Sequence, residues 1–310
     1  MLLNIILLII GLALLTKGAD LFVDGASSLA RKFHIPQIII GLTIVAMGTS
    51  APEASVSIAS AIKGASGVAI GNVFGSNIAN ILLILGLTSA ICNLKIQRNS
   101  IIYEMPFLLV ITAILGLMGY YIGSVNRICG FIFLLLFLVF MGYLFKMAKN
   151  STQIQEEEET KQLTPIKMVL FIIAGLVALV YGSDLTVNSA INIAHILNIS
   201  DRIIGLTIVA IGTSLPELVT CVVAAIKKQP DLAVGNIIGS NIFNILFVLG
   251  ITCAICPVPF DSAFYFDGAI AFLSIILLWI FTVKDTVLSR GEGIILTLSY
   301  IGYMLYLIIK

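Results

Sequence analysis

The chain has 310 residues, of which 59% are apolar and only 11% are charged, and its mean hydropathy is +1.12. A soluble domain carries about 25% charged residues, so this composition excludes a water-soluble globule and indicates an integral membrane protein. The net charge of +1 gives no basic surface, so we expect no nucleic-acid partner. The five cysteines have no metal-ligand spacing, which argues against a disulfide framework or a zinc site.

Ten apolar segments follow one another along the chain, each long enough to cross a bilayer as a helix. They lie near residues 2–23, 36–62, 68–91, 101–121, 127–146, 166–188, 200–226, 232–255, 264–283 and 291–309. A polar linker at 147–165 separates the first five segments (1–146) from the second five (166–310). The pattern predicts an all-α integral membrane fold with ten transmembrane helices.

The basic residues predict how this chain is oriented in the cell membrane. If the N-terminus lies outside, 12 of the 17 Lys and Arg residues fall in inner loops and 4 in outer segments. Basic residues collect on the cytoplasmic side, so both termini are expected outside and the central linker in the cytoplasm. We interpret the apolar N-terminus as the first span, because it lacks the basic residues and cleavage site of a signal peptide.

The chain contains an internal repeat. Residues 35–91 and 199–255 align without a gap at a constant offset of 164, and 32 of the 57 positions are identical. Each half contains five predicted spans, an odd number, so the second copy enters the membrane from the opposite side. Two such inverted five-helix repeats, with a binding site between them near the bilayer midplane, are typical of secondary transporters.

The sequence GTSxPE interrupts one apolar segment in each repeat, at residues 48–53 and 212–217. Proline lacks a backbone N–H and clashes with the carbonyl four residues earlier, so the helix should kink or break there. Carbonyls freed near Ala46 and Ala210 are tolerated at membrane depth only where protein or a wet cavity satisfies them.

Each break carries one glutamate, Glu53 or Glu217. A carboxylate inside the membrane is costly unless it is paired, and no Lys or Arg lies at comparable depth in the sequence. These residues therefore predict a cation-binding site. The alternative is a protonated glutamate that only holds helices together, which would leave the paired proline breaks unexplained.

The next span of each repeat carries the pattern GNxxGSNxxN. Helical spacing places Asn72, Ser76 and Asn80 on one face, and the second repeat has an equivalent stripe at 236, 240 and 244. The accompanying GxxxG pairs can be explained by close helix packing alone. Such packing would bring the polar stripe against the break that carries the glutamate.

The predicted site offers only oxygen ligands, a set that suits Ca²⁺, Na⁺ or Mg²⁺ and argues against zinc or copper. Ca²⁺ fits better than Mg²⁺ because it accepts more oxygens in a flexible geometry. The candidate ligands come from both repeats: Glu53, Glu217, Thr49, Thr213, Ser50, Ser214, Ser76, Ser240, Asn80, Asn244, Ala46 and Ala210. Two carboxylates would be neutralised by one Ca²⁺ or by two monovalent ions, so competition for one site could couple their movements.

In GTSAPE with GNVFGSNIAN, and in GTSLPE with GNIIGSNIFN, the chain resembles the sodium/calcium exchanger family of the cation/Ca²⁺ exchanger superfamily, especially its prokaryotic members. The resemblance implies exchange of Ca²⁺ for Na⁺, with Glu53 and Glu217 shared between the ions and Asn80 lining the centre. It also implies backbone carbonyl ligands for Ca²⁺ at Thr49 and Thr213. The flanking Na⁺ sites would be completed by Ser50, Ser76, Ser214, Ser240, Ala46 and Ala210.

One position departs from that resemblance. Many sodium/calcium exchangers have Asp where this chain has Asn244, which leaves the Na⁺ stoichiometry and any use of K⁺ or H⁺ open. The nearest rival function is therefore a H⁺/Ca²⁺ antiporter, and a cation channel is a rival of another class. We expect no enzyme activity and no cofactor, because the ions are transported substrates. The expected partner is the lipid bilayer, and no obligatory protein partner is evident.

Four further acidic residues lie near the ends of predicted spans. Asp20 and Asp184 are equivalent in the two repeats and could line a cation entry path or cap a helix end. Glu104 and Asp267 lie at the start of their spans, where we expect them to be solvated at the membrane interface.

Overall fold

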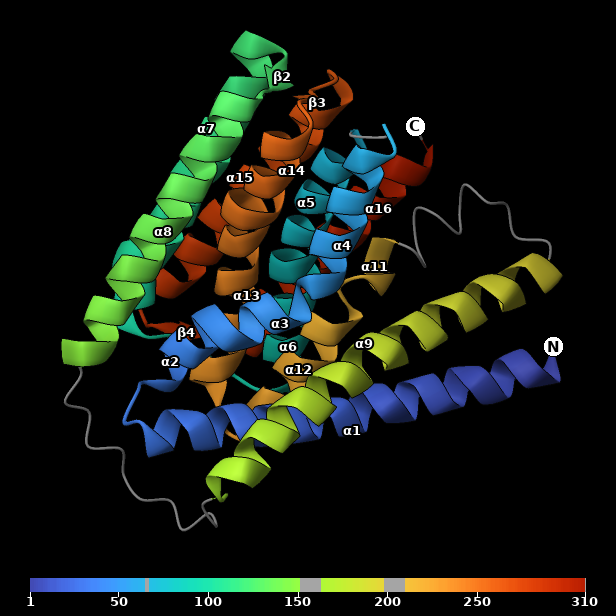
Figure 1. Ribbon diagram of the computed structural model, residues 1–310, viewed down its shortest axis with the longest axis vertical. Helices are drawn as coiled ribbons and strands as arrows, with labels where there is room; N and C mark the ends of the chain where they lie inside the picture. The colour runs from blue at the N-terminus through green and yellow to red at the C-terminus, as the bar shows by residue number, and fades with distance from the viewer. Residues whose placement is uncertain (65–66, 151–162, 198–209, 310) are drawn as a thin grey trace.

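The computed structural model describes residues 1–64, 67–150, 163–197 and 210–309 (Figure 1). Within these ranges the structure is almost entirely helical, and eight helical segments are long and apolar enough to cross a membrane. They are α1 (Leu2–Lys32), α5–η2–α6 (Gly67–Ile78, Ala79–Leu85, Gly86–Ile91), η3–α7 (Ser100–Glu104, Met105–Ile122), α8 (Arg127–Asn150), α9 (Pro165–Ile196), α13–η5–α14 (Pro230–Phe243, Asn244–Leu249, Gly250–Ile255), α15 (Ala263–Val283) and α16 (Arg290–Ile309). The prediction of an all-helical, multi-pass membrane protein is confirmed.

A ninth span is formed if the bent pair after α1 is counted as one. It consists of α2 (Gln37–Ile40), the π-helix η1 (Gly41–Val45) and α3 (Ala46–Thr49), followed by α4 (Ala51–Ile62) at an angle of 47°. The predicted break at 48–53 is confirmed: Ser50 leaves helical geometry, and Pro52 lies in the first turn of α4, where a missing N–H is tolerated. The equivalent segment in the second half contains α11 (Ala210–Gly212) and α12 (Leu215–Ile226). The start of that predicted span, 200–209, lies outside the described residues.

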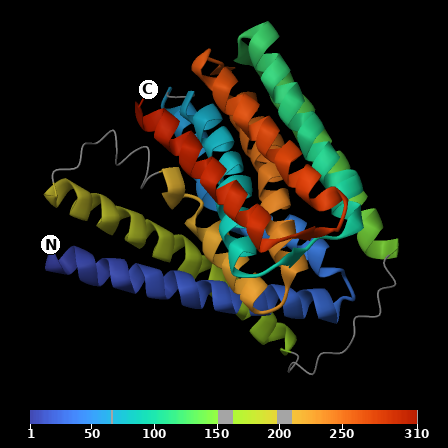
Figure 2. The same ribbon diagram turned by 180° about the vertical axis from the view of Figure 1, so that it is seen from behind.

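Two short antiparallel sheets mark the ends of the bundle. Strand β1 (Leu94–Lys95) pairs with β4 (Val287–Leu288), and β2 (Ser124–Val125) pairs with β3 (Val258–Pro259). The β1–β4 sheet lies at the end where α8 stops and α9 begins, which we call the linker end; the β2–β3 sheet lies at the far end (Figure 1, Figure 2). Each sheet joins the first half of the chain to the second.

Helices α1 and α9 run antiparallel, side by side, and cross the rest of the bundle obliquely (Figure 1, Figure 2). Glycines bring their backbones together: a Cβ added at Gly175 would lie 2.7 Å from the carbonyl oxygen of Gly18, and one at Gly182 would lie 3.0 Å from that of Gly11. Because no larger side chain fits there, α1 and α9 form one tightly packed pair.

The most buried spans are α5–η2–α6 and α13–η5–α14, which carry the repeated asparagine stripes. The other long helices expose many large apolar side chains, as expected for lipid-facing surfaces. Glu104 corrects one prediction. It is only 1% exposed, and the Tyr143 hydroxyl of α8 donates a 2.6 Å hydrogen bond to it, so this residue is buried between helices and not solvated at the interface.

The glycine contacts predict a packing-sensitive position. Gly175→Ala should lower the free energy of unfolding by about 1–3 kcal/mol, because the new methyl group meets the backbone of α1. Thermal unfolding in detergent measures the effect. The control is Gly142→Ala on α8, whose added Cβ meets no described atom within 4 Å and should leave stability unchanged or slightly raised. Equal melting temperatures for the two variants would contradict the packing argument.

Candidate cation site

The two helix breaks face each other in the middle of the bundle and exchange hydrogen bonds. Ser50 Oγ donates to Glu217 Oε1 at 2.8 Å, and Ser214 Oγ lies 3.4 Å from Glu53 Oε1 in the equivalent contact. Both glutamates are only 1% exposed. The structure thus brings together the two acids that lie 164 residues apart in the sequence.

The serine hydroxyls contact the opposite repeat and leave their own helices uncapped. Ser50 and Ser214 are the N-cap residues of α4 and α12, with glutamate three positions later, the spacing of a capping box. Neither serine makes a side-chain cap hydrogen bond. Each hydroxyl instead orients the carboxylate of the other half, so the site is assembled only when both halves are folded.

Four asparagines on α5, η2, α13 and η5 are joined across the two halves in the same two-fold pattern. The side-chain amides of Asn77 and Asn241 each donate to the other's backbone carbonyl, at 3.2 and 3.3 Å. Asn80 donates to Asn241 Oδ1 at 2.8 Å, and Asn244 donates to Asn77 Oδ1 at 3.2 Å. The π-helices η2 and η5 run through Asn80 and Asn244, and such local widening of a helix is frequent at functional sites.

Four buried oxygens of this cluster have no hydrogen-bond partner among the described residues: Glu53 Oε2, Glu217 Oε2, Asn80 Oδ1 and Asn244 Oδ1. An unpartnered buried acceptor costs free energy, about 1–3 kcal/mol for a neutral group and more for a charged one. All four are hard oxygen donors, and each pair is equivalent in the two repeats. The arrangement suits a cation such as Ca²⁺ or Na⁺.

No Lys, Arg or His pairs with either glutamate within the described part of the chain. The described part of the chain also contains no group of three His, Cys, Asp or Glu side chains that could hold a metal ion. A cation here would therefore be bound by two carboxylates together with hydroxyl, amide and carbonyl oxygens.

The other candidate ligands surround this cluster. Ser76 and Ser240 are buried on α5 and α13, as Thr49 is at the end of α3, and Thr213 is partly exposed. The Ala46 carbonyl accepts the Ser50 N–H at 3.0 Å, so it is bonded within its own turn. The Gly212 carbonyl accepts the Ser183 hydroxyl at 2.9 Å, which satisfies one carbonyl freed by the proline. Ala210 begins α11, and its side chain lies outside the described set.

Asn77 and Asn241 are the members of the cluster that the ligand prediction missed. They fall off the i, i+4, i+8 stripe, so helical spacing alone does not select them. Their repetition at an offset of 164, inside GSN, was the available signal.

The two halves of the site differ at one repeated contact. Asn72 Nδ2 donates to Ser57 Oγ at 2.9 Å, but the position equivalent to Ser57 is Cys221. Asn236 Nδ2 is buried and has no hydrogen-bond partner among the residues that the structure describes. Asn236 is bound instead through its Oδ1, which lies 3.0 Å from the Thr49 hydroxyl. Asn236 is fully buried, whereas Asn72 is partly exposed.

Comparison with known proteins places the chain in a family. The model of the sodium/calcium exchanger protein family matches residues 3–146 and 167–309. The chain belongs to this family. Its two matched segments correspond to the two halves on either side of the central linker, and its members are transporters, not enzymes.

Full-length relatives agree with this assignment. CaxA of Alkalimonas amylolytica is 42% identical over 313 residues, and the sodium/calcium exchanger MaX1 of Methanosarcina acetivorans is 32% identical over 349 residues; each alignment covers 98% of both chains. A solved structure of the sodium-calcium exchanger NCX_Mj with Na⁺ and Sr²⁺ superimposes with a TM-score of 0.84 at 33% identity, covering 97% of both chains. The chain therefore has the fold of a membrane exchanger.

The unpartnered Asn236 amide predicts a stabilising substitution. Cys221→Ser restores the acceptor that Ser57 provides in the first half, and should raise the free energy of unfolding by about 0.5–1.5 kcal/mol. The control is Cys253→Ser, also fully buried, where no such amide awaits a partner and the new hydroxyl should lower stability. Thermal unfolding of both variants tests the prediction. Equal changes in melting temperature, or a lower melting temperature for Cys221→Ser than for Cys253→Ser, would contradict the proposed contact.

Proposed function

We propose that this chain is an antiporter that exchanges Na⁺ for Ca²⁺ by alternating access, and that the ions bind between the two helix breaks. The observation that carries the proposal is the set of four buried, unpartnered oxygens on Glu53, Glu217, Asn80 and Asn244. Buried acceptors without donors favour a positive partner, and no cationic side chain reaches these acids within the described residues.

Charge balance supports exchange of unlike ions at one site. With Asn80 and Asn244 neutral, the two glutamates alone supply a charge of −2, which one Ca²⁺ or two Na⁺ neutralises. Binding of either ion then excludes the other, and the site can change its exposure from one side of the membrane to the other only when its charge is neutralised. Ser50, Ser214, Thr49, Thr213, Ser76, Ser240 and the carbonyls of Ala46 and Ala210 would complete the coordination.

We further propose that the two halves are inverted repeats of five spans each, ten in all. In support, β1 and β3 occupy equivalent positions at an offset of 164, yet β1 lies at the linker end and β3 at the far end. The paired contacts of Asn77 with Asn241, and of each serine with the opposite glutamate, have the same offset. In this arrangement the linker end is cytoplasmic and both termini lie outside, as the distribution of basic residues predicts.

Transport into liposomes tests the function. Purified protein in Na⁺-loaded vesicles should take up Ca²⁺, and K⁺- or choline-loaded vesicles at the same pH should not. Glu53→Gln or Glu217→Gln should reduce uptake at least 100-fold, because either change halves the negative charge available to Ca²⁺. The same variants should lose the thermal stabilisation that Ca²⁺ gives to the wild-type protein.

The matched control is Glu104→Gln, which neutralises an equally buried glutamate that contacts Tyr143 and lies on other helices. Its uptake should resemble that of the wild type. Uptake that follows a pH gradient and needs no internal Na⁺ would assign proton exchange instead, and conductance without countertransport would identify a channel.

A further inference from the structure

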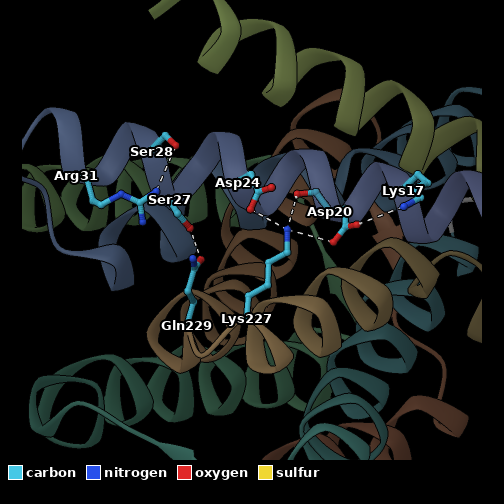
Figure 3. Close-up of polar contacts among 8 residues, drawn as sticks. All are labelled: Lys17, Asp20, Asp24, Ser27, Ser28, Arg31, Lys227 and Gln229. Atoms are coloured by element: carbon cyan, nitrogen blue, oxygen red, sulfur yellow. Dashed lines mark hydrogen bonds and ion pairs between the residues drawn. The ribbon is translucent and has the colours of Figure 1, made fainter. Parts of the chain in front are cut away.

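Helix α1 is tied to the loop between α12 and α13 at the linker end (Figure 3). Lys227 Nζ lies 3.1 Å from Asp20 Oδ1 and 2.7 Å from Asp24 Oδ1, and also donates to the Asp20 carbonyl at 3.1 Å. Ser27 Oγ donates to Gln229 Oε1 one turn further along α1. We call these five residues (Asp20, Asp24, Ser27, Lys227 and Gln229) the latch.

The latch adds polar contacts to the packing of the α1–α9 pair against α12. Its three α1 residues are spaced by four and three positions, so they share one face of the helix. That helix is held closely by α9 through the glycine contacts, whereas Lys227 and Gln229 follow α12, which carries Glu217. The start of α13 is in turn fixed to the linker end, where Gln97 donates to Asp231 at 2.7 Å.

Part of this charge pattern recurs in the other repeat, where the lysine and the aspartate are not joined. At the offset of 164, Lys63 is equivalent to Lys227, Asp184 to Asp20 and Asn188 to Asp24. Lys63 is exposed and makes no ion pair among the described residues, while Asp184 Oδ1 accepts a 3.0 Å hydrogen bond from its own neighbour Asn188. Of the two equivalent lysines, Lys227 is therefore engaged by α1, and Lys63 is not engaged by any described acid.

Burial of the site shows the same asymmetry. Thr49 and Asn236, on the segments that enter from the linker end, are each 0% exposed. Their equivalents Thr213 and Asn72, on the segments toward the far end, are partly exposed. The end at which the ion pair is made is therefore also the end at which the site is more tightly covered.

We propose that the latch holds the α1–α9 pair against α12 in the conformation closed at the linker end, and that Lys63 makes the equivalent contact with Asp184 when the far end closes. The inference rests on the proposed alternating-access function. The sequence predicts a weaker contact at the far end than at the linker end. At the far end Asn188 replaces the charged Asp24, and Ile191 and Ala65 replace the hydrogen-bonded pair Ser27 and Gln229. The described conformation is thus the favoured one, and solvent-exposed ion pairs are weak enough to break in every transport cycle.

Hydrogen–deuterium exchange of the full-length protein in nanodiscs tests the latch without relying on transport. In Lys227→Gln, peptides covering residues 17–32 and 226–231 should exchange about 3- to 10-fold faster, because the open population rises. In Lys63→Gln the same peptides should exchange more slowly, because the competing conformation loses its own contact. Lys227→Arg keeps the charge and should behave as the wild type.

The control is Lys228→Gln, which neutralises the adjacent exposed lysine and should leave exchange unchanged. If Lys227→Gln exchanges like Lys228→Gln, or if Lys63→Gln shifts exchange in the same direction as Lys227→Gln, the latch is overturned. If the ion pair were a static surface contact, Lys63→Gln would not change hydrogen–deuterium exchange at the linker end. The effect of Lys63→Gln on the linker-end peptides is therefore the decisive measurement. Should Lys227→Gln fail to fold, Lys63→Gln and Lys227→Arg still decide.

Transport gives a second readout. The Ca²⁺ concentration for half-maximal flux should fall about 3- to 10-fold at the linker end and rise at the far end in Lys227→Gln, with the opposite pattern in Lys63→Gln. If the wild-type protein moves no Ca²⁺ against Na⁺, the proposed function fails. The hydrogen–deuterium exchange experiment still tests whether the latch exists.

Discussion

The structure depends on one electrostatic constraint: two carboxylates are buried in an apolar bundle whose described residues provide no opposite charge near them. An isolated ion in this environment is strongly disfavoured, so the surroundings of Glu53 and Glu217 must either keep them neutral or supply a cation. The protein surrounds them with hydroxyl and amide oxygens, and four of the buried acceptors have no donor among the described residues. This arrangement favours a cation that binds reversibly over a permanent ion pair with a Lys or Arg side chain.

The broken helices follow from the same constraint. A continuous helix would satisfy its own backbone and leave few oxygens for an ion, whereas the break at Ser50 turns α4 by 47° and directs a serine hydroxyl across the bundle. Irregular backbone is tolerated at this depth because it is covered by protein. The Gly212 carbonyl, for example, is bonded by Ser183 from α9.

Much of this architecture could be predicted from the sequence, since apolar runs, proline breaks and an exact repeat offset are local signals. The pairing of Glu53 with Ser214, and of Glu217 with Ser50, could not, because the capping-box spacing favours a bond within each helix. Asn77 and Asn241 were missed for a similar reason: their bonds cross between repeats. Glu104 was misjudged because its position near a span end says nothing of Tyr143 on the neighbouring helix.

The two small sheets have a mechanical consequence. Each links the first half to the second through a pair of main-chain strands, one sheet at either end of the bundle, so the helices attached to them are fastened together at both ends. Sliding of one such half past the other would break both sheets at once. Helices α1 and α9 border neither sheet along the described chain, so no β-pairing among the described residues ties them to the rest of the bundle. Displacement of this pair leaves both β-pairings intact, so movement can be confined to α1 and α9 while the oxygen cluster stays in place.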